Sequence, residues 1–523
     1  MKQVKARQQV EKIKRPTIKL SNFVKTIQNI MRGDSGINGD AQRIEQMTWL
    51  IFLKIYGAKE ESWSVVGSSR SHSYKSIIPD EFHWENWAKD NKDGKALTGE
   101  PLLEFVNQKL FPALKNLNID VNTPIRQSIV KTVFEDANQY MKDGVLLRKV
   151  INVIDEIDFD EYHDKHAFGE IYETILKSLQ SAGNAGEFYT PRAVTDFIIE
   201  VLNPKLGEKV ADFACGTGGF LTAALKTLNS QVETTRDRRV IQESIYGIEK
   251  KPLPYMLCVT NLLLHDLDNP MIVHGNGLEK NVREYQKNDR FDVVVMNPPY
   301  GGTENEIIRS NFPKALQSGE TADLFMSVAM YRLKHLVEGG GRCAIIIPDG
   351  FLFGGDSAKT AIKEKLINEF NLHTIIRLPN SIFAPYTSIT TNILFFDNSK
   401  RTDEVWFYRV DMPEGQKHFS KTRPVKLEHF NSCLEWWNNR TVIADKDTDS
   451  FKSQKFNRDF LEHNGFNLDL CGYPKIEEEI LSPEETMLKY HELRTELNER
   501  IDATLSDIAK FLDIDLNKKI AGK

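Results

Sequence analysis

The sequence predicts an α/β protein in which a doubly wound parallel sheet is preceded by an all-α domain and followed by a long helix. Three observations predict this order: helical spacing of apolar residues in the first third of the chain, alternation of β-rich runs with amphipathic helices after about residue 205, and one capped, charged helix near the end. The chain has 523 residues, 40% hydrophobic and 27% charged, which is globular composition and excludes collagen-like and low-complexity classes. We expect roughly three domains, at residues 1–165, 166–415 and 416–523.

The predicted N-terminal domain, residues 1–165, shows the spacing of helices. Apolar residues recur three and four positions apart in the segments Phe23–Ile30, Met47–Tyr56, Leu102–Phe111 and Val145–Ile157. No alternating pattern typical of a strand lasts long enough there to compete. The sequence therefore predicts helices joined by polar loops.

The predicted central domain, residues 166–415, alternates strands with helices. The strands are Val210–Phe213, Ile245–Ile248, Met271–His274, Phe291–Met296 and Cys343–Ile347, and the helices are Phe220–Leu228, Tyr255–Leu264, Ala322–Val337 and Ala358–Phe370. This alternation is typical of β-α-β units, whose strands pair in parallel. Three strands without helices between them close the domain: His373–Leu378, Thr390–Phe396 and Val405–Val410. Because such strands can pair antiparallel, we expect a hairpin at one edge of the sheet.

The predicted C-terminal region, residues 416–523, ends in a helix. Ser482 and Glu485 have the spacing of a capping box, and Pro483 stands at the first helical position. Apolar residues then recur three and four positions apart, at Tyr490, Leu493, Leu497, Ile501, Leu505, Ile508 and Leu512. So narrow a stripe on a charged helix indicates a helix–helix seam, formed either within the chain or with another subunit.

Charge, hydropathy and cysteine content narrow the class of protein. The net charge is −6, so the chain lacks the basic excess of a protein that grips nucleic acid unaided. No apolar run approaches the ~18 residues of a membrane span, and we expect no membrane association. The five cysteines form no C-x-x-C pair, which predicts free thiols in a reducing cytoplasm and no metal site.

The segment Asp212–Phe220, Asp-Phe-Ala-Cys-Gly-Thr-Gly-Gly-Phe, carries the strongest local signal for a ligand site. It joins the first predicted strand to a helix, which is where open α/β sheets bind nucleotides. Its glycines allow a tight turn and close approach of a ligand to the backbone. The spacing differs from the dinucleotide fingerprint and from the P-loop. The carboxylate of Asp212 suits a ligand with an ammonium group better than a pyrophosphate.

Two further polar residues follow the next strands. Glu249 ends the second strand, where an acidic side chain can accept hydrogen bonds from both ribose hydroxyls. Asn276 follows the third strand and can bind the edge of an adenine. An adenosine ligand with an amino group and no phosphate cradle indicates S-adenosylmethionine.

The fourth strand runs directly into Asn297-Pro298-Pro299-Tyr300. The two prolines hold an extended backbone that ends the strand and directs the Asn297 side-chain oxygen and the Pro298 carbonyl into the cleft. Two acceptors held together can bind both hydrogens of a planar –NH₂ group. These bonds strengthen as the nitrogen becomes tetrahedral, so they stabilise the transition state of transfer to that nitrogen. The Tyr300 ring offers a stacking face for an extruded base.

The segments Asp212–Phe220 and Asn297–Tyr300 together resemble the cofactor and catalytic motifs of amino-group DNA methyltransferases. Gly186–Arg192, Gly-Glu-Phe-Tyr-Thr-Pro-Arg, is similar to their further cofactor motif, and the motif order is that of the γ class. Together with Phe168-Gly-Glu-Ile-Tyr-Glu173, these segments resemble the modification (M) subunit of type I restriction–modification systems. The resemblance implies a Rossmann-like S-adenosylmethionine-dependent methyltransferase sheet and methylation of adenine N6 in DNA. It covers most of the chain, but residues 415–480 match no motif.

The resemblance also implies a role for each matching residue. The methionine end of the cofactor would be surrounded by Glu187, Phe188, Tyr189, Thr190, Pro191 and Arg192 and lined by Thr217, Gly218 and Gly219. Asp212 would lie near the cofactor amino group, Glu249 would hold the ribose, and Asn276 would complete this set. Asn297, Pro298 and Tyr300 would hold a flipped adenine, with Phe383 as a second stacking face. Family members transfer the methyl group directly, with no covalent enzyme intermediate.

The same resemblance also implies partners, and the motifs leave alternative substrates open. The resemblance implies DNA as substrate, a separate specificity (S) subunit that reads the target, a second M chain and a restriction (R) subunit. The Asn-Pro-Pro-Tyr motif also occurs in enzymes that methylate guanine N2 of ribosomal RNA or a protein glutamine. Methylation of cytosine N4 is chemically close and is not excluded by the motif alone, and a non-catalytic assembly subunit can retain the fold. Intact Asp212, Glu249 and Asn297–Tyr300 favour an active enzyme over an assembly subunit.

Overall fold

The computed structural model describes residues 20–68, 74–90, 96–157, 169, 172–177, 189–420, 422–445, 450–472 and 482–511. The chain divides into two compact units, residues 1–474 and residues 475–523, and each is described by itself. Among the described residues, no helix is both long enough and apolar enough to cross a membrane. The domain boundaries expected at residues 165 and 415 stay predictions.

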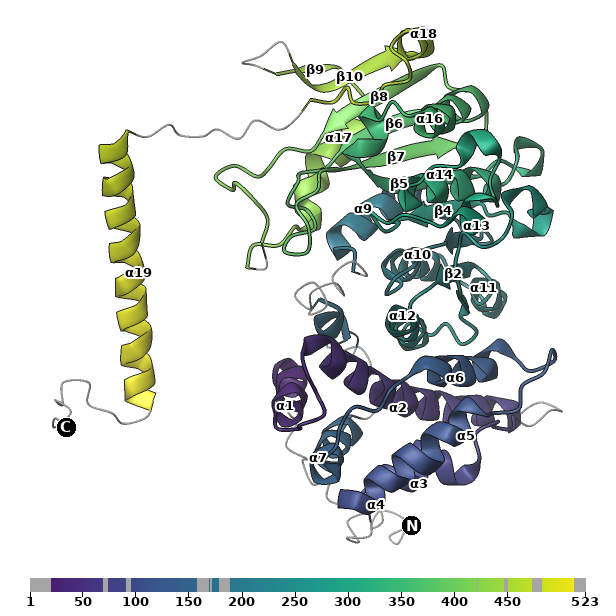
Figure 1. Cartoon of the computed structure of the whole chain (residues 1–523), viewed down its shortest axis with the longest axis vertical. Helices are drawn as coiled ribbons and strands as arrows, with labels where there is room; N and C mark the ends of the chain where they lie inside the picture. The colour runs from purple at the N-terminus through teal and green to yellow at the C-terminus, as the bar shows by residue number, and fades with distance from the viewer. Residues whose placement is uncertain are drawn as a thin grey trace, which may run out of the picture. The chain divides into compact units, whose positions relative to one another are not determined.

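The N-terminal part of the first unit is helical, as predicted (Figure 1). Its helices are α1 (Leu20–Arg32), α2 (Asp40–Ser68), α3 (Trp84–Trp87), α4 (Gly99–Glu104), α5 (Phe111–Lys115), α6 (Ile125–Asp136) and α7 (Gly144–Asp155). A π-helical turn, Phe105–Leu110, continues α4 into α5. The core holds edge-to-face aromatic pairs, with the ring of Trp49 5.1 Å from that of Phe111 and 6.4 Å from that of Phe134. This helical part therefore has an apolar core of its own.

Helix α12 (Pro252–Leu264) lies between the sheet and helices α2 and α6 (Figure 1). Lys59 on α2 reaches Asp266 and Asp268 just after α12, with N–O distances of 2.8 and 3.0 Å. The Tyr172 hydroxyl donates to the Leu257 carbonyl over 3.0 Å. The helical part and the sheet are thus joined by packing and by directed polar contacts.

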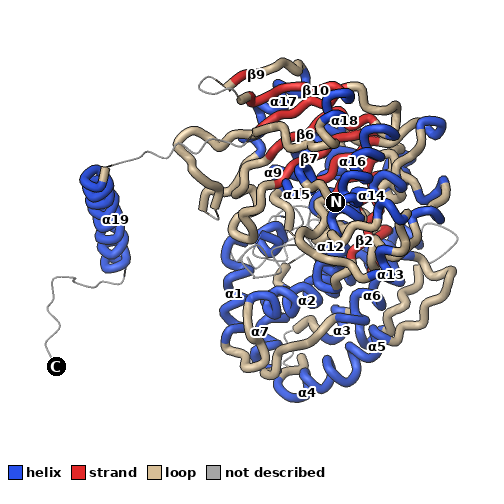
Figure 2. The backbone as a smooth tube through the Cα atoms, turned by 45° about the horizontal axis from the view of Figure 1, so that its top comes forward, coloured by secondary structure: helices blue, strands red, loops and turns tan. Residues whose placement is uncertain are grey.

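The sheet has ten strands in the described residues, in the order β3-β2-β1-β4-β5-β7-β6-β8-β10-β9. Figure 2 draws the strands in red. Their bounds are β1 Val210–Asp212, β2 Ile245–Glu249, β3 Met271–His274, β4 Val293–Met296, β5 Arg342–Pro348, β6 Asn371–Arg377, β7 Thr391–Asp397, β8 Glu404–Arg409, β9 Ile443–Ala444 and β10 Phe451–Asn457. Strands β1 to β5 pair in parallel, which confirms the predicted doubly wound core. Their carboxyl ends therefore meet at one edge, where the predicted site residues stand.

Both faces of the sheet are covered because its central strands are apolar on both sides. In β4, Val293 and Val295 join the core formed with α9 (Arg192–Leu202), α10 (Gly219–Asn229) and α12. Val294 and Met296 join the opposite core, formed with α14 (Thr321–Arg332) and α16 (Ser357–Glu369). The remaining helices are α11 (Thr235–Ile241), α13 (Glu306–Arg309), α15 (Asp349–Phe353), α17 (Asn431–Asn438) and α18 (Arg458–His463).

The hairpin expected at an edge of the sheet is present but lies inside it. β6 and β7 pair antiparallel as predicted, yet β7 inserts between β5 and β6. The reason is that β7 is apolar and buried on both faces, which a central position satisfies. β8 then pairs in parallel with β6, and the antiparallel pair β10 and β9 forms the edge.

Helix α14 ends five residues earlier than the helix predicted to reach Val337, and β4 begins two residues later than the strand predicted from Phe291. Past α14, Leu333 forms an isolated parallel bridge with Phe291. The Phe291 N–H donates to the Arg332 carbonyl over 2.8 Å. These contacts satisfy the backbone groups at the end of α14 without a further helical turn. The helix can therefore end at Arg332, although the apolar spacing in the sequence continues beyond it.

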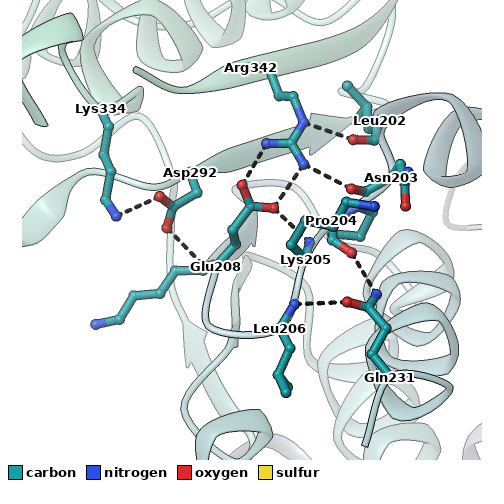
Figure 3. Close-up of polar contacts among 11 residues, drawn as sticks. Leu202, Asn203, Pro204, Lys205, Leu206, Glu208, Gln231, Asp292, Lys334 and Arg342 are labelled. Atoms are coloured by element: carbon teal, nitrogen blue, oxygen red, sulfur yellow. Dashed lines mark hydrogen bonds and ion pairs between the residues drawn. The ribbon is translucent and has the colours of Figure 1, made fainter. Parts of the chain in front are cut away.

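Polar contacts fix the loop between α9 and β1 at the amino ends of the strands (Figure 3). Arg342 at the start of β5 donates from Nε to the Leu202 carbonyl over 2.7 Å and from Nη2 to the Asn203 carbonyl over 3.1 Å. Its two Nη atoms also contact the Glu208 carboxylate, each over 2.8 Å. The contact with the Leu202 carbonyl holds the C-terminal end of α9 on the sheet. The directional bidentate pair with Glu208 holds the loop that follows it.

The second unit contains helix α19 (Pro483–Phe511). The predicted capping box is confirmed: Ser482 N donates to Glu485 Oε2 over 2.8 Å, and Glu485 N donates to Ser482 Oγ over 3.2 Å. The stripe residues Leu493, Leu497 and Ile501 are 53%, 55% and 52% exposed. The predicted last stripe position, Leu512, lies outside the described residues.

Candidate active site

The turn between β1 and α10 has the shape that its glycines predict. Gly216 and Gly218 have φ values of 53° and 76°, in the left-handed region that favours glycine. A Cβ on Gly218 would lie 2.8 Å from the Cys258 Sγ of α12. The backbone therefore turns tightly into the N-terminus of α10.

Asp212 ends β1 and is buried, with 1% of its surface exposed. Its carboxylate accepts a hydrogen bond from the Ala214 N–H over 3.0 Å. Burial raises the pKa of Asp212 to about 8, because one N–H contact offsets only part of the lost hydration. A cation placed against this side chain would restore its charged form.

Glu249 ends β2 and is also buried. Its Oε2 accepts from the Gly216 N–H over 2.8 Å, and its Oε1 accepts from the Lys251 N–H over 2.7 Å. Glu249 therefore fixes the glycine turn to the neighbouring strand. Because a carboxylate oxygen can accept more than one hydrogen bond, these contacts are compatible with a role toward ribose hydroxyls.

Asn276 follows β3 and uses its side-chain oxygen locally. Its Oδ1 accepts from the Leu278 N–H over 3.0 Å, which forms an Asx turn. This contact gives the side chain a structural role. Any role toward an adenine would fall to its remaining amide group.

Arg192 begins α9 and forms a bidentate pair with Glu173. Its Nε lies 2.8 Å from Glu173 Oε2, and its Nη2 lies 2.5 Å from Glu173 Oε1. Its guanidinium carbon lies 5.5 Å from the centroid of the buried Tyr189 ring. Among the described residues, the buried Arg192 Nη1 has no hydrogen-bond partner, and it lies 2.5 Å from where a Cβ of Gly219 would stand. One buried donor atom of this partly buried cation is thus unpaired, among the described residues, beside the glycine turn.

Asn297 follows β4, and both ends of its side-chain amide are engaged. Its Nδ2 donates to Thr190 Oγ1 over 3.0 Å. Its Oδ1 accepts a hydrogen bond from the Tyr300 hydroxyl. Burial raises the pKa of Tyr300 well above its usual value, so this hydroxyl is a protonated donor. The Tyr300 and Phe383 rings meet edge to face, with centroids 6.3 Å apart.

One open cavity joins these elements. Five of the predicted site residues line it: Thr190, Asp212, Thr217, Gly219 and Asn297. The rest of the lining consists of Ala214, Cys215, Gly216 and Phe220. Pro191 caps α9 and Gly218 caps α10 at its margin. Glu187 and Phe188 lie outside the described residues.

The donor set fits the amino-acid end of S-adenosylmethionine. That end carries one ammonium group and one carboxylate. Among the described residues, no cation pairs with the buried acid Asp212, and the partly buried cation Arg192 has one buried donor, Nη1, to spare. Glu173 was missed as a site residue because its pairing with Arg192, 19 positions away, follows no motif spacing.

The sequence and the fold match known proteins over most of the chain. The N-6 DNA Methylase family model matches residues 163–480, and the HsdM N-terminal domain model matches residues 20–154. The methylase subunit of the type I restriction enzyme EcoEI from Escherichia coli is 45% identical over 496 residues, 93% of this chain and 98% of that protein. A modification subunit from Vibrio vulnificus YJ016 is 40% identical with a TM-score of 0.75, over 86% of this chain and 95% of that chain. A chain from a structural study of complex assembly and conformational transition in the type I R-M system is 34% identical with a TM-score of 0.75, over 96% of this chain and 99% of that chain.

Proposed function

This chain belongs to the N-6 DNA methylase family, as the methylase subunit of a type I restriction–modification system, and we propose that it transfers a methyl group from S-adenosylmethionine to N6 of a flipped adenine. Family membership implies S-adenosylmethionine as the methyl donor. One observation supports the assignment of residues most strongly: Asn297 lines the same cavity as Asp212 and the glycine turn. A cofactor held at the turn and a base held at Asn297 would then meet in one cavity.

The residues around the cavity would hold the cofactor as follows. Asp212 accepts the ammonium group, the free Nη1 of Arg192 donates to the carboxylate, and Glu249 accepts the ribose hydroxyls. Gly218 and Gly219 place backbone next to the ligand without side-chain interference, and Thr217 lines the same turn. Tyr189, Thr190 and Pro191 would border the cofactor, with the Thr190 hydroxyl turned to Asn297. Glu187 and Phe188 stay predictions from the resemblance, and Asn276 stays a weaker candidate for the adenine. S-adenosylmethionine supplies a methyl group that is electrophilic because it is bonded to a sulfonium.

Asn297 would orient the target amine for transfer. Its Oδ1 and the Pro298 carbonyl accept the two N–H groups of adenine N6, which fixes the nitrogen lone pair away from both acceptors. As the nitrogen becomes cationic, its N–H groups become stronger donors, so both bonds stabilise the transition state more than the ground state. The Tyr300 hydroxyl donates to Asn297 Oδ1 in this structure, and because an amide oxygen has two lone pairs, the amine either takes the second lone pair or displaces this hydroxyl. The rings of Tyr300 and Phe383 then serve as stacking faces for the base.

The relatives indicate membership of a type I restriction–modification complex. We propose that a specificity subunit selects the DNA site, that two methylase chains share it, and that a restriction subunit joins them. The net charge of −6 agrees with a chain that needs a partner to hold DNA. The stripe on α19 is the surface that we assign to such a partner.

The proposed function is tested by methyl transfer to DNA with and without the co-encoded specificity subunit. We expect labelled methyl groups to appear in DNA only with that subunit, and nucleoside analysis to identify N6-methyladenine. Methylated cytosine, RNA or protein would contradict the proposed substrate. If the assembled complex transferred no methyl groups, the proposed methyltransferase activity would be contradicted.

The Asp212 assignment predicts that cofactor affinity depends on pH. The pKa of about 8 means that the free protein holds Asp212 protonated below that pH. Because an ammonium group favours the carboxylate, binding releases a proton, and affinity rises with pH between about 5.5 and 7.5, by up to about tenfold per unit. The number of protons released is measured by titrating S-adenosylmethionine into the protein in a calorimeter, in buffers of different ionisation enthalpy.

Asp212→Asn is expected to remove this proton release and to weaken binding by about 1–3 kcal/mol. The exposed Glu279→Gln serves as the matched control and is expected to behave as wild type. Equal affinity and equal proton release in wild type and Asp212→Asn would refute the ammonium contact.

A further inference from the structure

We propose that Thr190 is a positioning residue for the catalytic amide of Asn297, an inference that rests on the proposed function. The resemblance assigns Thr190 to cofactor binding, whereas the contact in this structure is with Asn297. Its Oγ1 accepts from Asn297 Nδ2 over 3.0 Å, although 107 positions separate the two residues. Both side chains line the same cavity.

The contact decides which way the Asn297 amide faces. An asparagine side chain rotated by 180° exchanges its oxygen and its NH₂ group, which have nearly the same shape. The Thr190 hydroxyl accepts on one side and so holds the rotamer that places NH₂ on that side, and the other rotamer would require this hydroxyl to turn and donate. With Nδ2 held by Thr190, Oδ1 is the group left for another donor, which in this structure is the Tyr300 hydroxyl.

This orientation matters because an adenine amine offers only hydrogens to the site. The rotated amide would present its own NH₂ group to that amine, and two donors would face each other. The Thr190 contact persists when a base displaces the Tyr300 hydroxyl, because it engages the other end of the amide. Thr190 thus acts on the reaction through Asn297 and need not touch the base.

The location of Thr190 also joins the two halves of the site. It lies two residues before Arg192, whose pairing with Glu173 and position at the start of α9 hold the local backbone. The backbone that Arg192 holds in place therefore also positions the Thr190 hydroxyl, which contacts Asn297. The catalytic amide is preorganised by the segment that we assign to the cofactor.

The test compares Thr190→Val, which keeps the shape and removes the acceptor, with Thr190→Ser, which keeps the hydroxyl. Each variant is assembled with the specificity subunit, and kcat, KM for DNA and the cofactor dissociation constant are measured. We expect Thr190→Val to lower kcat about tenfold, in line with one lost hydrogen bond, with cofactor affinity within threefold of wild type. Thr190→Ser should restore kcat to within about threefold.

Thr227→Val on α10 is the matched control, because that hydroxyl donates only to its own helix, at the Ala223 carbonyl. It is expected to match wild type in all three constants. The positioning role would be overturned if Thr190→Val kept kcat within twofold of wild type, or if it lost cofactor affinity and kept kcat. Either result would leave the proposed function standing. A wild-type complex that transfers no methyl group would overturn both.

Discussion

Replacing Asn297 with Ala is expected to lower methyl transfer to DNA by about 10²–10³-fold or more, while S-adenosylmethionine binds with nearly wild-type affinity. The loss is this large because the Asn297 contacts strengthen in the transition state, where a single preorganised polar group contributes most. Single-turnover transfer of labelled methyl groups measures the rate, and calorimetry without DNA measures cofactor affinity. The effect should fall on kcat rather than on cofactor binding.

Asn439→Ala is a matched control for this variant, because Asn439 is an exposed asparagine just after α17. It is expected to retain full activity. A rate for Asn297→Ala within a few-fold of wild type would refute the catalytic role. An equal loss of cofactor affinity would instead make Asn297 part of the cofactor site.

Placing Glu at both Leu497 and Ile501 on α19 is expected to abolish assembly with the specificity subunit or with a second methylase chain. Both side chains stand on the narrow apolar stripe and are half exposed. Two unpaired charges buried in a helix seam would cost several kcal/mol, enough to dissociate most subunit interfaces. Light scattering after gel filtration measures the mass of the complex, and calorimetry checks that the chain still binds cofactor.

Thr495→Glu with Ala503→Glu adds the same charge on other faces of α19 and serves as the control. This control should assemble and methylate DNA as wild type does. The intersubunit role is wrong if the stripe variant unfolds as an isolated chain, or if it assembles as readily as the control.

The sequence predicted the elements whose signals are local. β3 was predicted to the residue, and β1 and β2 to within one residue, because each is a short apolar or β-branched run bounded by polar or glycine residues. The turn after Asp212 and the strand end at Asn297 were also predicted, since glycine and proline restrict the backbone directly. These local signals explain why five predicted residues share one cavity.

The elements that the sequence did not predict depend on distant partners. β10 reads Phe-Lys-Ser-Gln-Lys-Phe-Asn, too polar to stand out, and it is a strand because β8 offers a free edge for pairing. The position of β7 between β5 and β6 depends on three strands at once. The contacts of Arg192 with Glu173 and of Asn297 with Thr190 join separate segments, so no spacing rule contains them.

The Arg342 contacts at the far end of α9 restrict how the length of this helix can change. Arg342 holds the Leu202 carbonyl, and the other end of the helix begins two residues after Thr190. One residue inserted in or deleted from α9 would turn its start by about 100° and shift it by about 1.5 Å relative to the fixed end. Thr190 and Arg192 would then leave their partners together. Insertions and deletions are therefore excluded from α9, whereas the loop between α5 and α6, where Val121 is fully exposed, can vary in length without reaching the site.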